Sequence, residues 1–146
     1  MSQRVYKILL VDDDPNCLDA VDQILRRDGY ETIKAEEGRS ALELLIDNSV
    51  DLAIVDFNLP DIDGIYVIDE IRRIYKNIPT IIMTSEMSKE VKLASLEAGA
   101  YSFVKKPIDI PIFRNIVAKA IRSLETRTIE IRHKTVFIRF FKGFRK

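Results

Sequence analysis

Cysteine and histidine are almost absent from this sequence, with one of each among 146 residues. Cys17 has no second cysteine to pair with inside the chain, so we expect a reducing compartment and no internal disulfide. With His133 as the other soft ligand, the chain cannot build a zinc site from nitrogen and thiolate donors. We interpret Cys17 as a buried inert thiol on a helix face rather than a nucleophile, because no basic group is placed to lower its pKa.

Long apolar runs and net charge are also lacking. No run approaches the ~20 residues of a membrane span, so we expect a cytoplasmic protein without one. Lys plus Arg and Asp plus Glu both number 23, and nothing in the whole chain predicts direct nucleic-acid binding. The charge is uneven, however: residues 125–146 carry about +5 and the preceding residues about −5.

Five short apolar runs alternate with five stretches of helical periodicity. The first helix should begin with Asp14 as its N-cap and Pro15 at its first position, and stop at Gly29. Five such strand-and-helix units predict an α/β fold with a parallel sheet and helices on both faces. The predicted strands are 5–11, 32–35, 52–55, 80–83 and 101–104; the helices that follow are 15–28, 38–47, a third bearing Ile65 to Ile74, a fourth bearing Val91 to Leu96, and a fifth bearing Ile112 to Leu124.

Unusual polar residues follow four of the predicted strands. Asp12 and Asp13 come after the first strand, Asp56 ends the third, Thr84 ends the fourth, and Lys106 follows the fifth. Any one of them can be explained as a turn or cap residue. Because ligands of open α/β sheets bind beyond the carboxyl ends of the strands, the five together predict a functional site there.

Three carboxylates in one crevice repel one another and need a compensating cation. Oxygen ligands with room for phosphate oxygens favour Mg²⁺ over Ca²⁺ or Zn²⁺. We assign Asp14 to helix capping rather than to the metal, because Pro15 after it sets the start of the helix.

Four sequence motifs occur together in a fixed order, and each is weakly informative alone. With them the chain resembles the response-regulator receiver domains of bacterial two-component signalling over about residues 5–124. The motifs are Val-Asp-Asp-Asp-Pro at 11–15, Val-Asp-Phe-Asn-Leu-Pro-Asp-Ile-Asp-Gly at 55–64, Met-Thr-Ser at 83–85, and Ala-Gly-Ala at 98–100 followed by Phe-Val-Lys-Lys-Pro at 103–107.

The resemblance implies a flavodoxin-like doubly wound (βα)5 fold with strand order 2-1-3-4-5. It also implies that Asp56 accepts a phosphoryl group and ligates Mg²⁺. Asp13 would hold the metal directly, Asp12 partly through water, and the backbone carbonyl of Asn58 would complete the protein ligands.

Further roles follow from the same resemblance. Thr84 and Lys106 would each bind a phosphoryl oxygen, and Thr84 would act as a switch together with Phe103, which is otherwise explained as an ordinary core residue. Lys105 does not match the family lysine and should be solvated. Asn58 and Glu86 flank the approach of the hydrolytic water, and residues of this kind predict a short-lived phosphoprotein suited to rapid signalling or phosphorelay.

As partners, the resemblance implies a sensor histidine kinase or a phosphotransfer protein upstream. A downstream effector or a homodimer would use the surface of the fourth helix, fifth strand and fifth helix. A receiver catalyses only its own Mg²⁺-dependent phosphorylation and dephosphorylation. We divide the chain into a receiver domain at 1–124 and a basic, aromatic C-terminal extension or linker at 125–146, for which self-association and binding to an anionic surface are the sharper alternatives.

Two other classes stay open on sequence grounds. A phosphatase of the haloacid-dehalogenase type would also use an aspartyl nucleophile and Mg²⁺, but it needs a second aspartate at the position of Asn58, and a neutral amide cannot serve as acid or base. A flavin or nucleotide carrier could share the fold. Its phosphate loop should be rich in Gly, Ser or Thr, whereas three consecutive aspartates would repel a phosphate unless a metal intervened.

Overall fold

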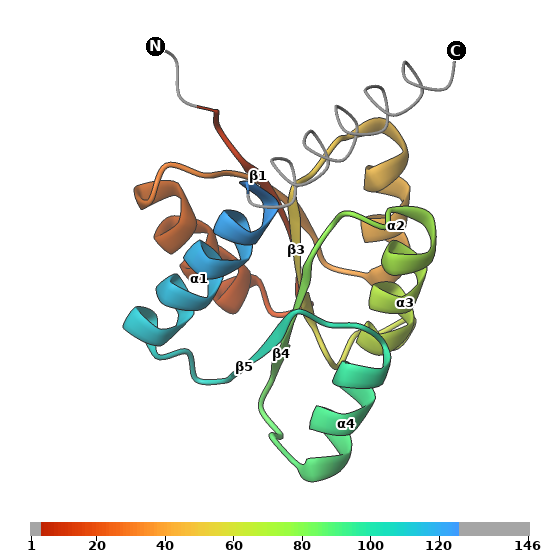
Figure 1. Cartoon of the computed structure of the whole chain (residues 1–146). Helices are drawn as coiled ribbons and strands as arrows, with labels where there is room; N and C mark the ends of the chain where they lie inside the picture. Colours follow the sequence, from red (N-terminus) through yellow and green to blue (C-terminus); the bar gives the residue numbers. More distant parts are fainter. Residues whose placement is uncertain (1–3, 126–146) are drawn as a thin grey trace, which may run out of the picture.

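Five short parallel strands form one sheet in the order β2-β1-β3-β4-β5 (Figure 1). The computed structural model describes residues 4–125. The strand order and the helices on both faces confirm the predicted flavodoxin-like doubly wound fold. The strands are β1 Lys7–Val11, β2 Glu31–Ala35, β3 Leu52–Asp56, β4 Thr80–Thr84 and β5 Ser102–Lys105.

Helices cover both faces of the sheet. One face carries α1 and a helix at residues 110–125, and the other carries α2, α3 and α4 (Figure 1). Because all five strands are parallel, they end at the same edge of the molecule. The labelled helices are α1 Pro15–Arg27, α2 Gly38–Asp47, α3 Gly64–Ile74 and α4 Lys89–Glu97.

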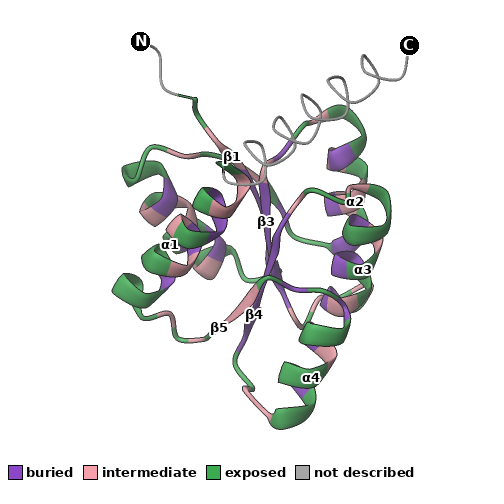
Figure 2. Cartoon of the chain, in the orientation of Figure 1, coloured by how far each residue is buried: buried purple, intermediate pink, exposed green. Residues whose placement is uncertain are grey.

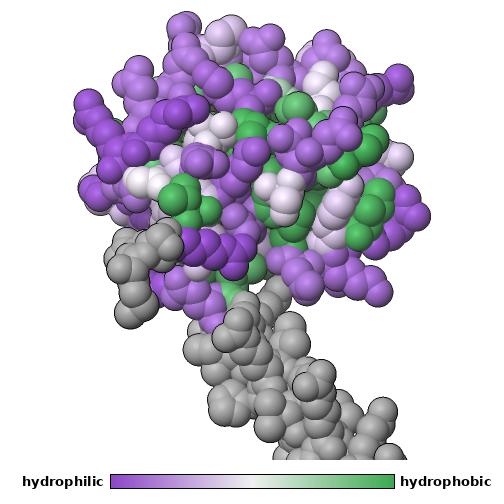
Figure 3. Space-filling view, turned by 90° about the horizontal axis from the view of Figure 1, so that it is seen from above, coloured by the Kyte–Doolittle hydropathy of each residue, from purple (hydrophilic) through white to green (hydrophobic). Residues whose placement is uncertain are grey.

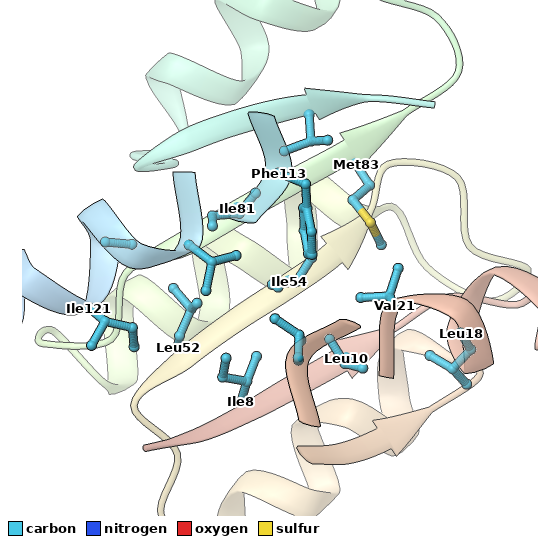
Figure 4. Close-up of a cluster of buried hydrophobic side chains, with 14 residues drawn as sticks. Ile8, Leu10, Leu18, Val21, Leu52, Ile54, Ile81, Met83, Phe113 and Ile121 are labelled. Carbon is cyan, nitrogen blue, oxygen red and sulfur yellow. The ribbon is translucent and has the colours of Figure 1, made fainter. Parts of the chain in front are cut away.

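The central strands are buried on both sides, which explains why they read as continuous apolar runs without alternation. Every residue of β3 and β4 is buried, and Lys7 is the one residue of β1 that is not (Figure 2). Alternate residues enter two separate cores, one under each layer of helices. Phe113 from the helix at 110–125 lies against β3 and β4 in the first core and is fully buried (Figure 4).

The predicted boundaries of α1 are confirmed. The Asp14 side chain accepts a hydrogen bond from the Asn16 N–H at 3.0 Å, and Pro15 begins the helix. Gly29 follows the helix with φ of +90°, a conformation in which a side chain would clash with the backbone.

Several apolar residues expected on buried helix faces are exposed, which corrects the sequence interpretation. They lie outside the stripe of residues with which each helix packs against the sheet. Strand β1 also begins two residues later than predicted, and Val5 is exposed. Hydrophobic side chains are also visible among hydrophilic ones on the end of the molecule where β1 begins (Figure 3). The exposed helix residues are Ile74, Leu93, Leu96 and Ile112.

The predicted extension at 125–146 lies outside the described residues, except for Glu125. Glu125 belongs to the helix at 110–125 and accepts a hydrogen bond from the Tyr6 hydroxyl at 2.8 Å. Within residues 4–125, no helix combines the length and apolar character that crossing a membrane would require.

Gly64 lets the start of α3 approach the end of β3 closely. Its N–H donates to the Phe57 carbonyl at 3.1 Å, and an added Cβ would overlap the Asp56 carbonyl oxygen and lie 2.9 Å from the Phe57 Cα. Both are backbone atoms, so neither can rotate away. A side chain at position 64 would therefore push on the residues that carry Asp56.

We expect Gly64→Ala to lower the free energy of unfolding by about 2 kcal/mol, because the added methyl group overpacks a rigid contact. Helix propensity alone predicts the opposite sign, a gain of roughly 0.5–1 kcal/mol. Urea unfolding of both proteins without Mg²⁺ measures the difference. A variant as stable as the wild type would contradict the close approach.

Candidate phosphoacceptor and metal site

The site lies at the edge of the sheet where β1 and β3 end next to each other. Asp12 directly follows β1 and is fully buried, and Asp56 is the last residue of β3 with 6% of its surface exposed. The Asp12 N–H donates to the Ala35 carbonyl at 3.1 Å, and the Phe57 N–H donates to the Met83 carbonyl at 2.8 Å. Hydrogen bonds to neighbouring strands therefore fix the backbone from which both carboxylates project.

Lys106 bridges these two carboxylates. Its Nζ lies 2.7 Å from the Asp12 Oδ2 and 2.6 Å from the Asp56 Oδ2. The Lys106 N–H donates to the Thr84 carbonyl at 2.7 Å, which ties the loop after β5 to the end of β4, and the Lys106–Pro107 peptide bond is cis. The ammonium group thus offsets two buried charges that would otherwise repel each other.

The pKa values of the two carboxyl groups are shifted in opposite directions. Burial alone would raise the pKa of Asp12, but hydrogen bonds from Lys106 and from the Asp14 N–H hold it below its ordinary value. Burial raises the pKa of Asp56 despite the hydrogen bonds from Lys106 and the Asn58 N–H. Burial would lower the pKa of Lys106, yet its two carboxylate partners raise it. Of the two carboxyl groups, Asp56 is therefore the one whose surroundings favour the protonated form.

Asp13 completes a group of three carboxylates suited to a divalent cation. Unlike the other two, it is exposed, and one oxygen from each of Asp12, Asp13 and Asp56 lies within 4.8 Å of the others. Three carboxylates against the one ammonium of Lys106 leave two negative charges in the crevice. Hard oxygen donors of this charge, open to solvent on one side, fit Mg²⁺. Asp14 is outside this group, in agreement with its capping role.

Thr84 is buried at the end of β4, but its hydroxyl is engaged within its own turn. Thr84 Oγ1 accepts a hydrogen bond from the Glu86 N–H and donates one to the Glu86 carbonyl, both at 3.0 Å. Among the described contacts it makes none with Asp56. To bind a group on Asp56, the Thr84 hydroxyl would have to exchange these partners.

Phe103 lies on the same face of the sheet as Thr84, because residues alternate along β4 and β5 and the two strands are paired in register. The ring is partly buried against the core under α2, α3 and α4. The Lys92 Nζ from α4 lies 5.9 Å from the ring centroid. Phe103 is therefore neither a fully buried core residue nor a free one.

Asn58 and Glu86 are both exposed beside the crevice, and Lys105 is exposed as predicted. The Asn58 N–H donates to the Asp56 Oδ1 at 3.1 Å, which the sequence did not suggest. Apart from Phe103, which lies within β5, the predicted site residues therefore come from loops and strand ends at one edge of the sheet.

The similarity of the chain to known proteins shows which family it belongs to. Residues 8–118 match the response regulator receiver domain family. The chain belongs to this family. It is 34% identical over 113 residues to sporulation initiation phosphotransferase F of Bacillus subtilis, covering 77% of this chain and 91% of that protein. It is also 34% identical over 129 residues to the regulatory protein AtoC of Escherichia coli, covering 88% of this chain but 28% of AtoC.

Solved receiver domains share the fold. A CheY-like receiver domain from Methanospirillum hungatei superimposes with a TM-score of 0.81 at 28% identity, over 85% of this chain and 99% of that one. The response regulator TrrA of Thermotoga maritima, solved in complex with Mg²⁺ and BeF, gives 0.73 at 33% identity, over 80% and 99%. The chain spans about a quarter of the length of relatives such as AtoC and the transcriptional regulatory protein GlrR.

Cys17 of this receiver domain is only half-buried, which corrects the expectation of a fully buried thiol. It faces the Asp12 carboxylate, and burial together with a hydrogen bond to Asp12 raises the pKa of the thiol to about 12. A raised pKa disfavours the thiolate, which agrees with the interpretation of Cys17 as an inert thiol.

We expect Lys106→Met to lower the free energy of unfolding of the metal-free receiver domain by about 3 kcal/mol near neutral pH, because Asp12 and Asp56 lose the cation between them. The loss should shrink near pH 4. The folded protein already binds a proton at Asp56 more readily than the unfolded chain does, so acidification favours the folded state of the variant.

The matched control is Lys105→Met, which removes the same charge from the adjacent exposed position. Denaturant titrations of the three proteins at several pH values give the comparison. Equal losses for the two variants, or a loss that does not depend on pH, would show that the Lys106 bridge is not what stabilises the carboxylates.

Proposed function

We propose that the chain is a phosphoacceptor switch that receives a phosphoryl group on Asp56 in a Mg²⁺-dependent reaction. The observation that carries the proposal is the grouping of Asp12, Asp13 and Asp56 with the ammonium of Lys106 at one end of the sheet. Phosphoryl transfer asks a protein mainly for positioning and charge neutralisation, and this crevice supplies both.

Asp13, Asp56 and the Asn58 backbone carbonyl would hold Mg²⁺, with Asp12 contributing partly through water. When bound, Mg²⁺ supplies positive charge that offsets the charge on the phosphoryl oxygens and on the attacking carboxylate. The donor chemistry fits, since carboxylate and carbonyl oxygens are the ligands that this ion prefers.

In the transfer step, a carboxylate oxygen of Asp56 forms a bond to phosphorus. The bond between phosphorus and the donor breaks, and the donor leaves with that electron pair. The product is an acyl phosphate. Lys106 would then turn from the Asp56 oxygen to a phosphoryl oxygen, and Thr84 would give up its partners in the turn to bind another.

The phosphoryl donor would be a sensor histidine kinase or a phosphotransfer protein. The name of the Bacillus subtilis relative, a phosphotransferase, supports a place in a phosphorelay. The chain would catalyse only its own phosphorylation and dephosphorylation, and we expect it to act in the cytoplasm. The division into a receiver domain at 1–124 and an extension at 125–146 is part of the same proposal.

The output surface would be formed by α4, β5 and the helix at 110–125. Thr84 and Phe103 lie on one face of the sheet next to α4, so a shift of the Thr84 hydroxyl would open space beside the Phe103 ring. This surface carries exposed apolar side chains that would be buried in an interface with an effector or a second copy of the chain. They are Leu93, Leu96, Tyr101 and Ile112.

We expect Asp56→Asn to reduce phosphoryl uptake to background, because the amide lacks the nucleophilic carboxylate oxygen. The measurement is the mass of the intact protein after incubation with acetyl phosphate and Mg²⁺, with the wild type in excess chelator as the control for metal dependence. Uptake by the variant at the wild-type rate and stoichiometry would disprove the assignment of Asp56.

We expect wild-type phosphoprotein to be short-lived, and the double substitution Asn58→Lys and Glu86→Leu to slow its hydrolysis on the order of tenfold. Both positions are exposed beside the crevice, and bulky or apolar side chains there would hinder a water from reaching phosphorus in line. Decay after removal of the phosphodonor measures this. Equal decay rates, or a wild-type lifetime of many hours, would contradict the prediction.

A further inference from the structure

The N-terminus of α2 is capped by a side chain from the loop between β3 and α3. The Asp61 carboxylate accepts hydrogen bonds from the Gly38 N–H at 2.8 Å on Oδ1 and from the Arg39 N–H at 2.9 Å on Oδ2. Glu37, at the N-cap position itself, makes no side-chain cap. The first N–H groups of a helix need acceptors, and here the loop after β3 provides them.

A second contact reinforces the first. Ile62 lies over Gly38 so closely that an added Cβ at position 38 would overlap the Ile62 side chain, and it would also lie 2.9 Å from the Val67 Cγ2. The carboxylate and the neighbouring apolar side chain therefore fasten the same stretch of loop to the start of α2. We refer to the contacts of Asp61 and Ile62 with Gly38 and Arg39 as the loop clasp.

The clasp holds one end of a short loop whose other end is the phosphoacceptor. The Asn58 N–H is bound to the Asp56 carboxylate, and the Gly64 N–H is bound to the Phe57 carbonyl at 3.1 Å. Between these points, Leu59 packs against the core under α2 and α3, and the Asp61 carboxylate is held by the N–H groups at the start of α2. Asp61 is thus one of the anchors that fix the path of the loop, and the Asn58 carbonyl lies between it and the hydrogen bond of the Asn58 N–H to Asp56.

We propose that Asp61 is a positioning residue for the metal site, which keeps the Asn58 carbonyl in place for Mg²⁺ without touching the ion. This inference rests on the proposed function. An anchored loop has less freedom to lose when the ion binds, so the anchor raises affinity. Removal of groups that orient metal ligands commonly weakens metal binding by 10–100-fold, and for this indirect effect we expect the lower end, about tenfold.

Asp61→Ala tests the inference, and Asp63→Ala is its matched control. Asp63 is an exposed carboxylate in the same loop, and its side chain makes no cap hydrogen bond with α3. Both variants lose one negative charge near the crevice, but only the first loses the hydrogen bonds of the clasp, while the Ile62 contact stays in both. Asp61→Asn keeps one acceptor oxygen and should restore part of the affinity; it also replaces Asp61→Ala if that variant does not fold.

Two readouts that do not depend on turnover decide the result. Calorimetric titration with Mg²⁺ should show about tenfold weaker binding for Asp61→Ala and a change of at most about twofold for Asp63→Ala, because an exposed charge is screened. Amide hydrogen exchange of the metal-free proteins should show faster exchange at Gly38 and Arg39 in Asp61→Ala alone. In the phosphorylation assay, the Mg²⁺ concentration for half-maximal rate should rise while the rate at saturating Mg²⁺ stays near wild type.

Faster exchange at Gly38 and Arg39 with unchanged Mg²⁺ affinity would overturn the inference, since the clasp would then only cap α2. Equal weakening in Asp61→Ala and Asp63→Ala would also overturn it and leave simple electrostatics as the cause. A wild-type protein that binds no Mg²⁺ would instead overturn the proposed function. Asp13→Ala, which removes a proposed ligand, shows how large a direct loss is in the same assay.

Discussion

The ammonium of Lys106 between the carboxylates of Asp12 and Asp56 is the interaction on which the site depends. Two carboxylates this deeply buried cannot both remain ionised without a cation nearby, and Lys106 reaches both within 2.7 Å. When Asp13 is included, three carboxylates face one ammonium group, so the crevice keeps an excess of negative charge. The crevice therefore has a cation of its own between the two buried carboxylates and still carries negative charge that would attract a divalent cation.

The fold supplies this arrangement through parallel strands that end at one edge. Asp12, Asp56, Thr84 and Lys106 are far apart in the sequence, yet backbone hydrogen bonds between neighbouring strand ends bring them together. The loop after β3 is held at two places, at Gly64 by close backbone approach to Asp56 and Phe57 and at Asp61 by the contact with α2. Local order around Asp56 thus comes from long-range packing.

Much of this could be predicted from sequence because its signals are local. The bounds of α2 at Gly38 and Asp47, the cap at Asp14 and the strand ends follow from periodicity and turn chemistry. Other features depend on contacts between distant segments. The exposure of Leu93 and Leu96 depends on how much of α4 the sheet covers, and the hydroxyl partners of Thr84 depend on the shape of one turn. Position 37, before α2, holds a glutamate, which is not among the preferred N-cap residues, and this was a sequence clue that another side chain such as Asp61 caps the helix.

A crystal structure of the protein with Mg²⁺ and beryllofluoride would show directly whether Lys106 and the three carboxylates act as proposed. We expect the fluoride complex on the Asp56 carboxylate, Mg²⁺ on Asp13, Asp56 and the Asn58 carbonyl, and Lys106 moved from the Asp56 oxygen to a fluoride. Beryllofluoride bound elsewhere, or Lys106 still bridging Asp12 and Asp56 beside an occupied metal site, would contradict it.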